Sequence, residues 1–141
     1  DITVAAESSS FIQAFSKIGL IPDSGGTFFL PRIIGRQMAT ALMMLGDKIS
    51  ATDADKMGMI YKSCSDDNFA DEALAIASRL SKMPTVGLGL TKRALNKSLT
   101  NDLDMQLAVE DLLQTAASNT EDYKEGVQAF LEKRKPNFKG K

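Results

Sequence analysis

The stretch FIQAFSKIGLIPDSGGT, residues 11–27, decides how the fold of this chain is interpreted. Its second part, residues 19–27, holds three glycines and one proline, a density of chain-breaking residues that predicts a loop. The apolar residues 28–34 follow directly and predict a short helix, which Gly35 ends. The sequence therefore places a glycine-rich loop immediately before a helix.

On either side of this loop the pattern predicts short strands. The β-branched run at residues 2–6 predicts one strand, residues 11–15 predict a second, and residues 59–61 predict a third. Two or three strands of this length are marginal by themselves. We therefore expect further polypeptide to complete the sheet.

Past residue 65 the pattern is helical, with apolar residues at helical spacing through residues 69–83 and 103–113. Among the helix ends, Ser50 is predicted to cap a short helix that Gly58 follows, and Thr120 to cap the last helix. We therefore divide the chain into residues 1–64, which mix strands, turns and helices, and residues 65–141, which are helical.

Composition excludes several kinds of function. The 141 residues, with 17 Lys and Arg against 18 Asp and Glu, suit one globular domain and give no basic surface for a nucleic acid. No apolar run reaches the roughly 18 residues that a membrane-spanning helix needs. The absence of histidine excludes a Ser-His-Asp relay and a His-containing zinc site, and the single Cys64 excludes an internal disulfide. We predict no metal site, so catalysis would need carboxylates, backbone amides or a bound cofactor.

Asp23, in the glycine-rich loop, has two interpretations. Asp23 or Ser24 could cap the following helix, and the residues alone favour this interpretation. Alternatively, Asp23 could act as a general base between apolar walls. Those walls would come from the same segment: Phe15, Leu20, Phe28 and Phe29. The pair Gly25-Gly26 could bind a phosphate or serve close packing, and no phosphate-binding motif favours the first.

The C-terminal residues 133–141 include five basic side chains. They could form a solvated tail, which is the usual role of such a segment. They could instead clamp an anion, with Phe130 or Phe138 available to stack on a purine. The balanced charge elsewhere favours a small phosphorylated ligand over a nucleic acid.

Several stretches taken together resemble the enoyl-CoA hydratase/isomerase, or crotonase, superfamily. They occur in order and span essentially the whole chain: residues 1–7, 11–27, 45–51, 54–60 and 125–134. Within the superfamily, parts of the chain resemble the 1,2-epoxyphenylacetyl-CoA isomerases of phenylacetate breakdown. The residues that carry this closer similarity are 14–17, 22–26 and 84–90.

The resemblance implies an α/β fold, the ClpP/crotonase spiral, of which this chain would be the C-terminal part, mostly helical with a few short strands. Residues 1–64 would hold the end of the spiral core with the active-site loop, and residues 65–141 the helices of the trimerisation region. The implied assembly is a cytoplasmic homotrimer or hexamer, with an acyl-CoA substrate as ligand and neither nucleic acid nor membrane as partner.

The resemblance also implies an acyl-CoA isomerase. Hydratases of the superfamily carry a catalytic Glu where this chain has Phe15, whereas its isomerases use an acidic residue at the position of Asp23. Asp23 would take a proton from a thioester's carbon skeleton, and the resulting enolate would be reprotonated elsewhere. This would convert 1,2-epoxyphenylacetyl-CoA to oxepin-CoA, or a 3-enoyl-CoA to the 2-enoyl form. The only coenzyme required is the CoA that carries the substrate.

The resemblance further implies which residues bind the substrate. Phe15 would line the acyl pocket, joined by Leu20 and Leu30 on their apolar character, while Phe130 and Lys133 match positions that approach the adenine and phosphates of CoA. In the family, both N–H donors for the enolate oxygen lie in the half before the first residue of this chain. We therefore expect the 141 residues alone to be inactive. Two alternatives stay open: an enoyl-CoA hydratase, and a non-catalytic fragment that only oligomerises.

Overall fold

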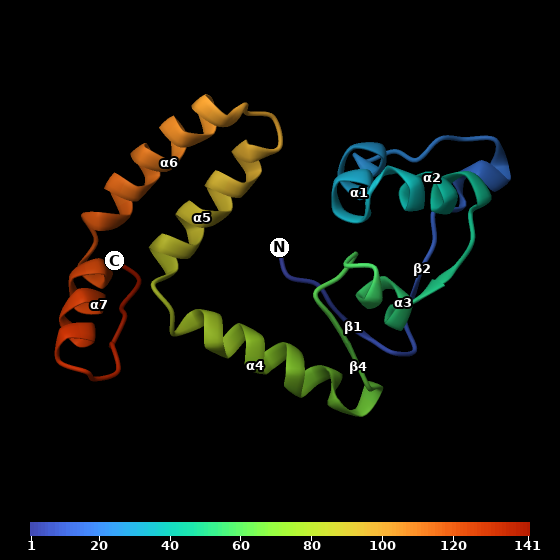
Figure 1. Ribbon diagram of the computed structural model, residues 1–141. Helices are drawn as coiled ribbons and strands as arrows, with labels where there is room; N and C mark the ends of the chain where they lie inside the picture. The colour runs from blue at the N-terminus through green and yellow to red at the C-terminus, as the bar shows by residue number, and fades with distance from the viewer. The chain divides into compact units, whose positions relative to one another are not determined.

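The computed structural model describes residues 1–141 and divides into two compact units, residues 1–73 and 74–141. Helices dominate, and the strands are only two or three residues long (Figure 1). The expected mostly helical chain with a few short strands is confirmed, and the last strand ends at Cys64.

The strands of the first unit form two small sheets. Strand β1 (Val4–Ala6) runs parallel to β4 (Lys62–Cys64), and the two lie side by side in Figure 1. Strand β2 (Ser10–Phe11) pairs in antiparallel fashion with β3 (Ile49–Ser50). The strand predicted at residues 2–6 is therefore confirmed, and its partner comes from the far end of the unit.

Two predicted strands are wrong in position. Of residues 11–15 only the first belongs to a strand, because the chain turns into the 3-10 helix η1 (Ala14–Ile18). The strand predicted at residues 59–61 begins instead at Lys62. The reason is that the N–H groups of Met59 and Ile60 both turn back to the carbonyl of Ala54, at 2.9 and 3.4 Å, and close the preceding helix.

Three α-helices complete the first unit: α1 (Gly26–Ile34), α2 (Arg36–Leu45) and α3 (Ala51–Lys56). The apolar helix predicted over residues 28–34 is α1, and Gly35 ends it as expected. At α3 the predicted cap is confirmed, because the Ser50 hydroxyl accepts the N–H of Asp53 at 3.0 Å.

The core of the first unit is small and rich in alanine. Ala51 and Ala54 of α3 are fully buried, and they pack in one cluster with Ala5 of β1 and with Ile60. Their short side chains let α3 lie directly against the strands. Partly buried side chains surround this cluster: Phe11, Ile49 and Met59.

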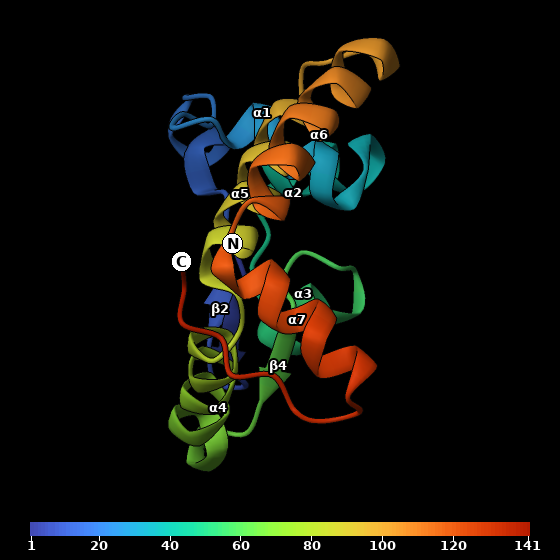
Figure 2. The same ribbon diagram turned by 90° about the vertical axis from the view of Figure 1, so that its left-hand side faces the viewer.

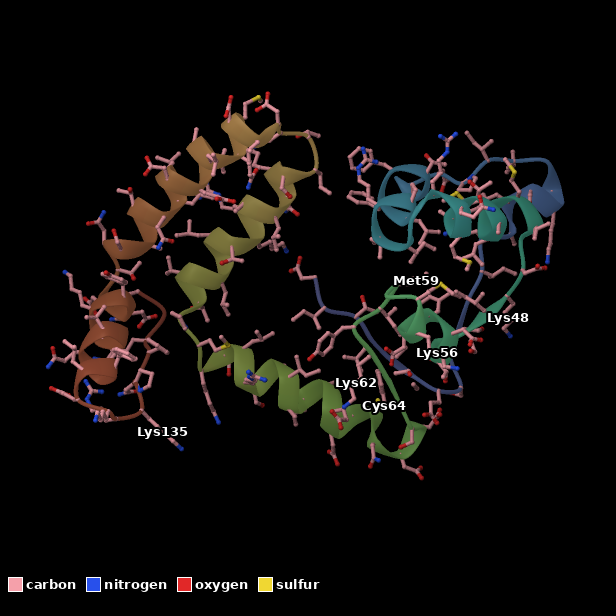
Figure 3. The ribbon with its side chains drawn as sticks, in the orientation of Figure 1. Lys48, Lys56, Met59, Lys62, Cys64 and Lys135 are labelled. Atoms are coloured by element: carbon pink, nitrogen blue, oxygen red, sulfur yellow. The ribbon has the colours of Figure 1, made fainter.

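Two polar contacts hold the end of β4. The short 3-10 helix η2 (Asp66–Asn68) follows the strand, and its Asp66 carboxylate accepts the Ser8 hydroxyl and, at 3.1 Å, the Ser8 N–H. Lys62 of β4, marked in Figure 3, forms an ion pair with Glu72 at 2.8 Å.

The regular elements of the second unit are all helices. Helix α4 (Phe69–Ser81) leads into it, and α5 (Thr85–Ser98) and α6 (Leu103–Ser118) then form an antiparallel hairpin (Figure 1). Helix α7 (Glu121–Leu131) is capped by Thr120 as predicted, since its hydroxyl accepts the Tyr123 N–H at 3.0 Å. None of these helices combines the length and the apolar character needed to cross a membrane.

Candidate active site

The loop before α1 has an unusual backbone. Ser24 and Gly25 both lie in the left-handed region, with φ of +51° and +79°. Two such residues in succession turn the chain sharply, so that α1 starts only at Gly26, whose N–H donates to the Asp23 carbonyl at 2.8 Å. Among non-glycine residues, only Ser24 and Lys133 have a positive φ.

The Asp23 carboxylate is exposed and caps no helix. The interpretation of Asp23 or Ser24 as the N-cap is wrong, because Gly25 occupies that position and no side chain bonds to the first turn. The carboxylate accepts a hydrogen bond of 3.1 Å from the Ser24 hydroxyl. Its oxygens are therefore not committed to holding the fold.

The glycine pair serves close packing. A Cβ atom added at Gly25 would lie 2.9 Å from the ring of Phe29, and one at Gly26 would lie 3.4 Å from Pro22. The positive φ of Gly25 adds a second reason for glycine there. These two constraints account for Gly25 without a bound phosphate.

The residues predicted to line an acyl pocket fall into two groups. Phe15 is half-buried in η1 and Leu20 is 59% exposed, and the two are joined by a backbone hydrogen bond of 3.0 Å. Leu30 is instead almost fully buried and borders a small cavity of about 90 Å³. That cavity is not lined by Phe15, Leu20 or Asp23. Leu30 is thus a core residue of this unit.

Two polar residues near the loop were missed at the sequence level. Arg32 lies over the Phe28 ring, 3.6 Å from its centre, and donates to the Phe28 carbonyl at 2.8 Å. Gln13 has a buried Oε1 without a hydrogen-bond partner, and a Cβ added at Gly26 would lie 3.7 Å from that oxygen. The spacing of Arg32 from Phe28 along a helix was a usable signal, but nothing in the sequence marks Gln13.

In the second unit, the residues after α7 are bound to that helix. Asp122 is 3% exposed, and its carboxylate accepts the N–H groups of Lys139 at 2.6 Å and Gly140 at 2.8 Å. The Asp122 N–H in turn donates to the Lys141 carbonyl at 2.9 Å. The segment doubles back along α7 (Figure 2). The interpretation of a freely solvated tail is therefore wrong.

An ion pair fixes the turn between α7 and this segment. Both guanidinium Nη atoms of Arg134 bond to Glu125, at 2.6 and 2.8 Å, and its Nε bonds to Glu132 at 2.6 Å. Glu125 also accepts the Asn137 N–H at 2.7 Å. The Arg134 guanidinium and then the Asn137 amide lower the pKa of Glu125 from 4.5 to about 2.

The two residues expected to meet CoA are both exposed. Phe130 is 82% exposed, whereas Phe138 lies partly buried, with its ring 3.5 Å from where a Cβ of Gly126 would be. Lys133 is exposed, forms no ion pair, and has a left-handed φ of +53°. Of the two phenylalanines, Phe130 is the one with an open ring.

The six predicted site residues therefore form two local groups. Four of them lie in the first unit, around the loop before α1, and the other two lie at the end of α7 in the second: Phe15, Leu20, Asp23, Leu30, Phe130 and Lys133. No group of three or more acidic, histidine or cysteine side chains gathers where it could hold a metal ion.

Comparison with known proteins identifies the family of this chain. The family model for enoyl-CoA hydratase/isomerase matches residues 1–141. The chain is 50% identical over 141 residues to the 1,2-epoxyphenylacetyl-CoA isomerase of Escherichia coli (strain K12), covering 100% of this chain and 54% of that protein. It is 42% identical over 141 residues to a protein of Rhodobacter capsulatus named "Probable enoyl-CoA hydratase", covering 100% of this chain and 55% of that protein.

Solved structures agree in fold. The crystal structure of an enoyl-CoA hydratase from Bacillus anthracis superposes with a TM-score of 0.94 at 33% identity, over 100% of this chain and 55% of that one. The chain thus spans about half the length of the curated relatives it matches. The expected crotonase-type fold is confirmed, and over all its residues the chain belongs to the enoyl-CoA hydratase/isomerase family.

Proposed function

We propose that the natural gene product containing this chain is an acyl-CoA isomerase in which Asp23 moves the proton. The observation that carries this proposal is the state of the Asp23 carboxylate, which is exposed, caps no helix and accepts a bond only from the adjacent Ser24. A carboxylate that does not stabilise the fold and lies in a strained loop is available to exchange a proton with a bound ligand.

For a 3-enoyl-CoA the proposed step conserves all atoms and electrons. Asp23 takes a proton from carbon 2, between the thioester carbonyl and the double bond, and the C–H electron pair enters an extended enolate. The protonated Asp23 then returns the proton at carbon 4, which leaves a 2-enoyl-CoA and regenerates the carboxylate. No oxidant, reductant or metal takes part in this balance.

The similarity to relatives supports an isomerase and leaves a hydratase as the second candidate function. The relative at 50% identity is named an isomerase, whereas the one at 42% is named a hydratase. A hydratase remains the second candidate for this reason. Against it, Phe15 occupies the position where hydratases of the family carry their Glu, and a phenyl ring can neither give nor take a proton.

Substrate binding is part of the same proposal. Phe130 offers an open ring for the adenine, and Lys133 offers an unpaired cation for a phosphate. Phe15 and Leu20 present surface for the acyl group, while Leu30 is buried in the core of the same unit. A cytoplasmic homotrimer or hexamer is also proposed, with residues 65–141 as the assembling helices.

The proposal is tested on the natural gene product with two substrates. With a 3-enoyl-CoA we expect the absorbance of a conjugated enoyl thioester to appear, and with a 2-enoyl-CoA we expect it to persist. Loss of that absorbance by hydration, with no isomerisation of the 3-enoyl-CoA, would establish the hydratase instead. The 141-residue chain assayed alone should be inactive, and turnover by it would refute the expected need for amide donors outside this chain.

A further inference from the structure

A lysine occupies a place where this chain otherwise uses glycine. Helix α2 ends at Gly46 with φ of +64°, and α3 is followed by Gly58 with φ of +74°. After α7 the left-handed residue is Lys133, with φ of +53°. A side chain is strained in this conformation because its Cβ crowds the following carbonyl.

The ends of α3 and α7 have the same backbone hydrogen bonds. After α3, the Gly58 N–H donates to Asp55 and the Met59 N–H to Ala54, both at 2.9 Å. After α7, the corresponding bonds run from Lys133 to Phe130 at 3.2 Å, and from Arg134 to Ala129 at 3.0 Å. The two turns thus differ in the side chain that occupies the left-handed position. The lysine there is not explained by the turn itself.

The contacts around Lys133 leave its charge free. Its neighbours Glu132 and Arg134 bond to each other at 2.6 Å, and Arg134 also holds Glu125 through two hydrogen bonds. Both carboxylates therefore bond to Arg134 and not to Lys133. Lys133, between the paired residues, is exposed and forms no ion pair of its own.

We propose that Glu125 and Arg134 are positioning residues that hold the strained turn at Lys133 and thereby orient its ammonium toward a phosphate of the bound CoA ester. This inference rests on the proposed function. The two-pronged ion pair joins the body of α7 to the residue directly after Lys133, and the Asn137 N–H on Glu125 ties the following segment to the same carboxylate. Neither positioning residue needs to contact the ligand.

The test is a double-variant cycle in the natural gene product, with free coenzyme A as the titrated probe. We expect Lys133→Ala to raise the Kd roughly tenfold, the loss of one charge-assisted contact. Glu125→Gln should raise it about three- to tenfold with kcat at saturating substrate unchanged, and should have no further effect in the Lys133→Ala background. Lys135→Ala is the matched control, because this lysine of the same segment extends away from α7 (Figure 3) and its removal should leave the Kd unchanged.

Each other outcome has a definite meaning. Unchanged Kd in Glu125→Gln, or additive effects of Glu125→Gln and Lys133→Ala, would overturn the positioning role while leaving Lys133 as a ligand. Unchanged Kd in Lys133→Ala would overturn both the inference and this part of the CoA site. Isomerase activity of the unaltered protein is assayed in parallel, so failure of the proposed reaction is seen separately. If Glu125→Gln does not fold, Arg134→Lys keeps the charge without the two-pronged contact and answers the same question.

A further variant separates strain from binding. Lys133→Gly removes the cation and relieves the left-handed strain, whereas Lys133→Ala removes the cation and keeps the strain. Both should weaken coenzyme A equally, and only the glycine variant should raise the Tm. A Tm for Lys133→Gly at or below that of Lys133→Ala would show that the turn is not strained and would overturn the inference.

Discussion

Ser24 donates a hydrogen bond from its hydroxyl to Oδ1 of Asp23, and it does so from a left-handed backbone with φ of +51°. The same backbone moves the start of α1 to Gly26 and leaves the Asp23 side chain outside the helix. Local chain geometry thus separates this carboxylate from the capping role that its sequence position suggests.

Replacing Asp23 tests the role of its charge. Asp23→Asn keeps the size of the side chain and removes the base, so we expect kcat of the natural gene product on a 3-enoyl-CoA to fall by about 10²–10⁴-fold. Asp67→Asn, at an exposed acid in η2, is the matched control and should leave kcat unchanged. An Asp23→Asn protein that keeps most of its kcat would refute the assignment.

The backbone at Ser24 can be tested apart from its hydroxyl. Ser24→Val places a β-branched side chain in the left-handed region, which we expect to cost about 1–3 kcal/mol of unfolding free energy and most of the isomerase activity. Ser24→Gly also removes the hydroxyl but suits the backbone, and should keep activity within a few-fold. Urea unfolding and kcat are measured on both. Equal losses in the two variants would assign the effect to the hydroxyl instead.

Asp122 is expected to hold the C-terminal segment. Asp122→Ala leaves the N–H groups of Lys139 and Gly140 without their acceptor, at a cost of about 1–3 kcal/mol. Trypsin should then cut after Lys139 faster than in the unaltered protein, as followed by mass spectrometry. Glu121→Ala, at the exposed neighbour, should not change the cleavage rate, and an Asp122→Ala protein that resists trypsin equally well would contradict the expectation.

The low pKa of Glu125 predicts how stability depends on pH. Its pKa of about 2 lies below the ordinary 4.5, so folding favours the charged form. The stabilisation is fully present above pH 4.5 and is lost as the pH falls toward about 2. Thermal unfolding followed by circular dichroism should show this fall in Tm. Glu125→Gln should flatten it, and an unchanged slope in that variant would assign the loss to other carboxyl groups.

The alanine core predicts intolerance to larger side chains. Ala54 is fully buried against Ala5 and Ile60, so Ala54→Leu should overpack this cluster and cost about 1–3 kcal/mol of unfolding free energy. Ala70→Leu, at an exposed position of α4, should change it little. Chemical denaturation measures both variants, and comparable stability of the two would mean that the core can rearrange.

Local chemistry made several features predictable from the sequence. Capping by Ser50 and Thr120 follows from hydroxyl side chains before helical patterns, and Gly35 and Gly58 mark helix ends for the same local reason. The family followed from motifs spread along the whole chain, and the comparisons confirm it.

The misplaced features depend on contacts that sequence patterns do not display. Residues 59–61 have the composition of a strand, but their first N–H groups close α3 and Ile60 enters the core. Asp23 is of a residue type common at helix N-caps, but Ser24 takes a rare backbone conformation that no sequence pattern predicts. Lys133 was expected as a ligand by resemblance, whereas its strained backbone and paired neighbours are visible only in three dimensions.

The parallel pairing of β1 with β4 also orders events during synthesis. The loop that carries Asp23 leaves the ribosome long before Lys62, the residue that pairs with Val4. Contacts so distant along the chain form slowly, because the intervening segment must first lose its freedom. The pairing of β1 with β4 is therefore a late step of folding, completed only after β4 has emerged.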